Sequence, residues 1–176
     1  MNTLDWRDDP ARRCELLTNA PAFREWAGHV GFPATITRGI RHERQRKRAI
    51  HLRETLALIF SAVVRGAPPP RKALALLTRW TQSAWRHRRM VFERGELVWR
   101  WQPDTDAADR VLFEITLDAG ALLLSPDRHR IGLCAGEGCG WLFVDHSKGG
   151  KRRWCSMAAC GNRLKVRQYR ERKSHD

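Results

Sequence analysis

The sequence predicts a mainly α-helical N-terminal domain with one small β-hairpin, followed by a small α+β module that four cysteines hold together. Two observations predict this division. Apolar residues recur at helical spacing along most of the first 126 residues, and four of the five cysteines lie in the last quarter of the chain. We therefore expect a helical domain over residues 1–126 and a cysteine-rich module over residues 127–176.

Four helices and a hairpin are expected in the first part. Asn19 and Pro21 mark the start of a helix that ends near residue 30, and a longer helix is expected over about residues 38–65. A third helix begins near residue 71, after a proline-rich break, with an apolar stripe through Leu74, Leu77 and Trp85. Residues 90–101 form a hairpin that turns at Arg94-Gly95, and residues 107–124 form the last helix.

Cys134, Cys139, Cys155 and Cys160 are spaced as C-x4-C, fifteen residues, C-x4-C, which is typical of a structural zinc site. Each pair can hold one side of a tetrahedral ion, and glycines around the first pair permit the tight turns that direct its thiolates. Two disulfides, or a Cys3His set that uses His146 or His129, are the alternatives. The fifth cysteine, Cys14, is expected to be a small buried residue.

The N-terminal end, MNTLDWRDD, is polar and has no apolar signal segment, which favours a reducing cytoplasmic location and so metal over disulfides. No apolar stretch is long enough to span a bilayer, so no membrane partner is expected. An enzyme is also not expected, because four thiolates leave a zinc ion no open position and no catalytic motif is present.

The cysteine module should fold as a treble-clef-like finger. Residues 131–133 and 141–144 can pair as a hairpin beside the first cysteine pair. Ser156 is a good N-cap for a helix over about residues 157–172, which places Cys160 in its first turn. Trp141 and Trp154 are expected to form the small core of the finger, although stacking on bases is an alternative role for both.

The formal net charge of +14 predicts a polyanionic partner such as nucleic acid. The segment from Cys134 onward is more than twice as basic per residue as the rest. We expect it to contact nucleic acid through Lys151, Arg152, Arg153, Arg163, Lys165, Arg167 and Arg170. Asn162 is expected to hydrogen-bond the backbone around the cysteines, although reading of an adenine is an alternative. The basic run 41–48 is either a solvated helix face or an extension of this surface.

The segments CAGEGCGWLFVD (134–145) and RRWCSMAACGNR (152–163) closely resemble the CGNR zinc finger family, which is named for the tetrapeptide at residues 160–163. The preceding region resembles, more loosely, the ABATE domain that is usually fused to this finger. Members usually carry a short segment before the position matched by residues 2–5, so either the start was placed too late or this chain has lost an N-terminal strand or turn.

The resemblance implies a stress-induced bacterial transcription regulator. We therefore expect a Zn²⁺-dependent protein whose finger binds double-stranded DNA, while the helical domain senses a small-molecule effector or mediates assembly, for example as a homodimer. An RNA-binding or ribosome-associated zinc protein is the first alternative, because phosphate neutralisation serves either nucleic acid. A zinc-stabilised protein-interaction module is the second.

Overall fold

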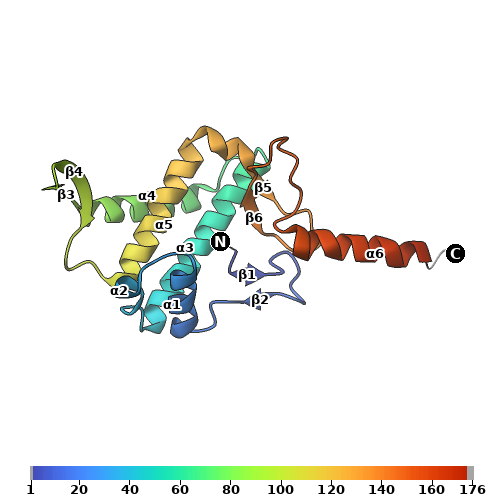
Figure 1. Cartoon of the computed structure of the whole chain (residues 1–176), viewed down its shortest axis with the longest axis horizontal. Helices are drawn as coiled ribbons and strands as arrows, with labels where there is room; N and C mark the ends of the chain where they lie inside the picture. The colour runs from blue at the N-terminus through green and yellow to red at the C-terminus, as the bar shows by residue number, and fades with distance from the viewer. Residues whose placement is uncertain (1, 174–176) are drawn as a thin grey trace.

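The computed structural model describes residues 2–173 and shows a body of packed helices with a finger at one end (Figure 1). The helices of the body are α1 (Ala20–His29), α2 (Ala34–Thr37), α3 (Glu43–Val64), α4 (Arg71–Arg86) and α5 (Ala107–Leu124). Their apolar faces enclose one core, whose fully buried side chains include Phe23, Leu52, Phe60, Val111 and Leu112. The prediction of a mainly helical domain is confirmed.

The helix starts follow the capping residues. Asn19 Oδ1 accepts a hydrogen bond of 2.8 Å from the Ala22 N–H and begins α1. Asp106 likewise caps α5, which has the predicted bounds. The second predicted helix was wrong at its start, because the chain breaks after α2 and α3 begins only at Glu43. The buried Gln45 side chain accepts hydrogen bonds from the N–H groups of residues 41 and 42, which stabilises this break.

The predicted hairpin forms from β3 (Arg88–Glu93) and β4 (Glu96–Trp101), which pair antiparallel. Arg94 and Gly95 at its turn both have positive φ, 53° and 86°, as a two-residue turn with the right twist requires. The expected apolar stripe of α4 was partly wrong. Its buried side chains are Ala73, Leu77 and Ala84, whereas Leu74 and Trp85 are exposed.

The N-terminal segment contains a strand pair that the sequence did not predict, β1 (Leu4–Asp5) with β2 (Cys14–Glu15). Arg53, a buried residue of α3, fixes this segment. Its guanidinium donates two hydrogen bonds of 2.7 Å to the Glu15 carboxylate and one of 3.1 Å to the Thr3 carbonyl. Cys14 is exposed in β2, so the expectation that it is buried was wrong.

The C-terminal part contains η1 (Pro126–Arg130), β5 (Ile131–Leu133), β6 (Leu142–Val144), η2 (Met157–Gly161) and α6 (Asn162–Lys173). β5 and β6 pair antiparallel, and Ile131 and Leu142 are buried in the same core as the helices of the body. The β5–β6 hairpin, called the finger hairpin below, is therefore packed on the helical body. α6 has no buried side chain and projects away from the molecule at the end opposite β3 and β4 (Figure 1).

Among residues 2–173, no helix has both the length and the apolar character needed to cross a bilayer.

Candidate metal centre

The four predicted cysteines come together in the structure. Their Sγ atoms all lie within 4.8 Å of one another, with 3.8 Å between Cys139 and Cys155 and 3.7 Å between Cys155 and Cys160. Four sulfurs at about 2.3 Å from one tetrahedral ion are about 3.8 Å apart, so the arrangement fits Zn²⁺. All four are free cysteines, which excludes the disulfide alternative in this structure. The metal-ligand group found in the described residues contains neither His129 nor His146.

The finger hairpin positions the first two ligands. Cys134 directly follows β5, and its N–H donates to the Trp141 carbonyl at 2.8 Å. The chain then turns back, and the Cys139 N–H donates to the Gly136 carbonyl at 3.1 Å. Gly138 and Gly140 have positive φ, 68° and 62°, on either side of Cys139, which aims this thiol at the other three.

The second pair of ligands lies at the start of the C-terminal helical segment. Ser156 caps that segment by accepting a hydrogen bond from the Ala159 N–H, as predicted, and Cys160 follows in the first turn. The turn is a π-helix, η2, before α6 continues as a regular helix. Trp141, Trp154 and Cys155 pack against the three buried cysteines, so the predicted role of both indoles as the finger core is confirmed. The result is the predicted treble-clef-like arrangement.

Two backbone groups and one cation act on the sulfurs. The N–H groups of Gly136 and Cys155 donate to the Cys134 sulfur at 3.4 and 3.3 Å. Burial raises the pKa of Cys134, but these donors outweigh it, so that the pKa lies below its usual value. The Arg163 guanidinium donates to the Cys160 sulfur at 2.7 Å and offsets part of the charge that four thiolates leave around a divalent ion.

The surroundings of the other two thiols, Cys139 and Cys155, favour their protonated forms. Burial, together with the neighbouring sulfurs, raises the pKa of Cys139 to about 12 and also raises the pKa of Cys155. Both would stay protonated at neutral pH, although metal ligation requires thiolates. Cys134, Cys139, Cys155 and Cys160 would bind a divalent ion as thiolates, so metal binding would be coupled to release of these protons and to formation of the finger.

The N-terminal segment covers the first pair of cysteines. The N–H groups of Arg7 and Asp8 donate to the carbonyls of Cys139 and Gly138, both at 3.2 Å. The side chain of Asn2 forms two hydrogen bonds with the backbone of Leu142, one as donor and one as acceptor. The ligands are therefore held by a second piece of chain more than a hundred residues away in the sequence.

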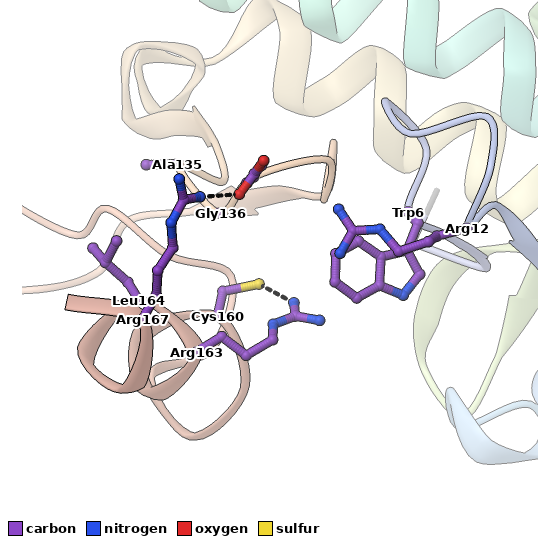
Figure 2. Close-up of a pocket in the computed structure, with 9 residues that line it drawn as sticks. Trp6, Arg12, Ala135, Gly136, Cys160, Arg163, Leu164 and Arg167 are labelled. Atoms are coloured by element: carbon purple, nitrogen blue, oxygen red, sulfur yellow. Dashed lines mark hydrogen bonds and ion pairs between the residues drawn. The ribbon is translucent and has the colours of Figure 1, made fainter. Parts of the chain in front are cut away.

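A cavity of about 200 Å³ lies between this segment and the finger (Figure 2). Trp6 forms one side, with the guanidinium of Arg12 at 3.9 Å and that of Arg163 at 4.3 Å from its ring centroid. Arg163 therefore contacts both the ligand Cys160 and the N-terminal indole. Sequence reasoning missed this role of Trp6, because no spacing relates residue 6 to residue 163.

The predicted nucleic-acid contacts separate into two groups. The guanidiniums of Arg152, Arg163 and Arg167 are used within the finger. Arg152 donates to the carbonyls of residues 144, 154 and 155, and Arg167 forms ion pairs with Glu137 and Glu171. Lys151, Arg153, Lys165 and Arg170 are exposed and form no ion pair with any residue in the range 2–173. Lys148 and Lys173, which were not among the predicted contacts, are also exposed and form no ion pair within this range, whereas the Arg172 guanidinium donates to the Gln168 carbonyl at 3.2 Å.

Asn162 lies exposed at the start of α6, and its side chain forms no hydrogen bond with the described part of the chain. The structure therefore does not form the predicted bond to the backbone around the cysteines, and Arg163 is the residue of this turn that contacts a ligand. Val166 and Tyr169, which lie on the same side of α6 as Asn162, are also exposed.

Asp145 shapes the basic loop and was missed from sequence. Its two carboxylate oxygens accept hydrogen bonds of 2.8 Å from the N–H groups of Ser147 and Arg152. A hydrogen bond from the Ser147 side chain, together with these two backbone bonds, lowers the pKa of Asp145. The two backbone bonds also close the loop that carries Lys148 and Lys151. The pattern D-x-S is a signal for such a turn, because an Asp side chain commonly accepts from the backbone two residues on.

A helical body joined to a four-cysteine metal site defines a metal-binding finger protein. The model of the ABATE family, described as "Putative stress-induced transcription regulator", matches residues 1–126, and the chain therefore belongs to this family. The model of the CGNR zinc finger matches residues 130–173, which include all four cysteines. Comparison with curated proteins gives no match.

Proposed function

We propose that this chain is a Zn²⁺-dependent transcription regulator that binds double-stranded DNA through α6 and the basic loop 148–153. The exposure and the positive charge of α6 carry the proposal. The helix has twelve residues, no buried side chain and six cations against one acidic residue, Glu171. An isolated helix of this length is marginal in water, so a polyanionic partner would stabilise it.

The dimensions and the attachment of α6 suit a DNA groove. Twelve residues give a helix about 18 Å long, and a single helix fits the major groove, which is about 12 Å wide. The helix starts within two residues of the ligand Cys160, so metal binding fixes its direction relative to the body. This coupling explains why a regulator would place its contact helix directly after a metal ligand.

The structure also favours one subset of the predicted contacts. Lys165 and Arg170 present free charges on α6, whereas Arg167 is already neutralised by two carboxylates. Arg46 and Arg48 of the run 41–48 form ion pairs with Glu43 and Asp109, which favours a structural role for that run. Four thiolates complete the coordination of zinc, and this supports a structural ion over a catalytic one.

The proposal is tested by the salt dependence of duplex binding by the full zinc-loaded chain, followed by fluorescence anisotropy. Lys165→Ala and Arg170→Ala should each lower the slope of log K against log salt by about one, because each removes one phosphate contact. Arg24→Ala, an exposed arginine of α1 without an ion pair among the described residues, is the matched control and should leave the slope unchanged. Equal slopes for all three variants would refute α6 as the contact surface.

A further inference from the structure

The outer part of the β3–β4 hairpin carries an apolar face that no residue in the range 2–173 covers. The register places Met90 opposite Trp99 and Phe92 opposite Leu97 on one face. Phe92 is 72% exposed and Leu97 is 68% exposed, and Met90 and Trp99 are about half exposed. Trp85 of α4 extends this surface, since its ring meets that of Trp99 edge to face at 5.2 Å.

The same face of the hairpin packs on the helical body at its base. There Trp101 packs on Phe113 of α5, with 5.8 Å between ring centroids, and its indole N–H donates to Glu114 at 2.8 Å. Arg88 is held by the same carboxylate at 3.0 Å. The hairpin is thus fixed at its base, and its outer half extends beyond the helices as a two-stranded sheet (Figure 1). Two strands alone are marginal in water, so such a face gains stability from a cover.

We propose that a second copy of this chain covers this face and forms a twofold dimer through the β3–β4 hairpin. The apolar area is of the right size. Large apolar side chains bury about 150–250 Å² each, so the exposed fractions of these five residues correspond to roughly 500 Å². A standard interface buries about 800 Å² per partner, of which about two thirds is apolar in homodimers.

The composition of the face also favours a second copy over nucleic acid as the cover. Glu93 is already paired with Arg100 at 2.6 Å and Arg88 with Glu114 at 3.0 Å, so these side chains bring no net charge to the face. The four apolar residues on the strands have no charged residue between them, which disfavours nucleic acid as the cover.

The position of the hairpin makes association of two such basic chains feasible. The hairpin lies at the end of the molecule opposite α6 (Figure 1), so pairing there keeps the two cationic fingers far apart. The inference does not rest on the proposed DNA binding, because the oligomeric state is measured without nucleic acid. In a DNA-binding dimer, the same geometry would present two fingers to two half-sites.

Sedimentation equilibrium of the full zinc-loaded chain, from micromolar to near-millimolar concentration, tests the dimer. Wild type should shift from a mass of 20.4 kDa to about twice that mass. Phe92→Glu and Leu97→Glu should each raise the dimer dissociation constant at least tenfold, because each buries two uncompensated carboxylates across the twofold axis. Both side chains are exposed in the single chain, so both variants should retain the zinc content of wild type and, at concentrations where wild type is a monomer, its thermal stability.

Leu124→Glu is the matched control, since Leu124 is a large apolar residue, 85% exposed, at the end of α5. It should dimerise like wild type. A wild-type chain that stays at the monomer mass throughout would overturn the proposal. So would a dimer whose dissociation constant is unchanged by both hairpin variants, or is raised equally by Leu124→Glu.

Discussion

The substitution Gly136→Ala tests how closely the finger is built around its metal. A Cβ at residue 136 would lie 2.9 Å from the Cys160 sulfur, 3.0 Å from the Cys160 Cβ and 3.4 Å from the Cys134 sulfur. Carbon and sulfur in ordinary contact are roughly 3.6 Å apart, so the new methyl group is too close by roughly 0.7 Å. Because two of these atoms are metal ligands, the chain cannot relax here without moving a ligand.

The expected cost follows from overpacking. Inserting a methyl group into a well-packed site costs about 1–3 kcal/mol, which corresponds to an affinity for Zn²⁺ lowered by about 5- to 150-fold. Gly120→Ala is the matched control, since the same methyl group there meets no atom within 4 Å and lies inside helix α5. That variant should keep the zinc affinity of wild type and gain about 0.5–1 kcal/mol of stability from helix propensity.

The assay is competition for Zn²⁺ between the full-length chain and a chromophoric chelator at neutral pH, with helical content followed by circular dichroism. A zinc affinity of Gly136→Ala within about twofold of Gly120→Ala would refute the packing argument. A loss of helical content in Gly136→Ala beyond that of the finger would show that the methyl group acts on the body as well as on the metal site.

Three further predictions concern the N-terminal segment. Arg53→Met should lower the free energy of unfolding by about 2–3 kcal/mol, since it leaves the partly buried Glu15 carboxylate unpaired and leaves Glu54 with Arg7 alone. Arg24→Met, at an exposed site, should change the free energy of unfolding little in the same urea titration. Burial raises the pKa of Glu15, but hydrogen bonds from Arg53 and the Leu17 N–H bring the net value below the ordinary 4.5. Glu15→Gln should therefore lower the free energy of unfolding above pH 4.5, and this difference from wild type should vanish as the pH falls through the lowered pKa of Glu15. A difference in the free energy of unfolding that persists in acid would contradict this. Trp6→Ala should speed zinc loss to excess chelator by about tenfold, because Arg163 loses the ring that it packs against. A rate equal to that of the distant control Trp85→Ala would show that Trp6 does not help Arg163 to stabilise the metal site.

The sequence predicts most of the helices and the metal site because both depend on short-range patterns. The Asn19 cap, the Arg94-Gly95 turn and the cysteine spacing each specify a local geometry that the fold keeps. The late start of α3 depends on Gln45, whose side chain also donates to the Gly39 carbonyl and to Asp106 at the start of α5. Such a tertiary contact leaves no periodic signal.

The residues of the metal centre also differ in how far the sequence predicts them. The ligands could be predicted, but the partners of the ligands could not, because Trp6, Arg7 and Asn2 reach the finger only through the folded body. A count of cations likewise could not distinguish Arg163 and Arg167, which are held by a sulfur and by carboxylates, from the free Arg170. Sequence gives the charge of a helix, whereas the folded chain decides which charges remain available.

We propose that metal binding at the four cysteines presents α6 to double-stranded DNA. The direct test is the affinity of the zinc-loaded chain for duplex DNA, with structured RNA as competitor and with zinc-depleted protein and Cys155→Ser as metal-free samples. We expect salt-sensitive binding that prefers duplex DNA and is lost without zinc. Binding that is equally tight without the metal, or that structured RNA displaces preferentially, would refute this role of α6.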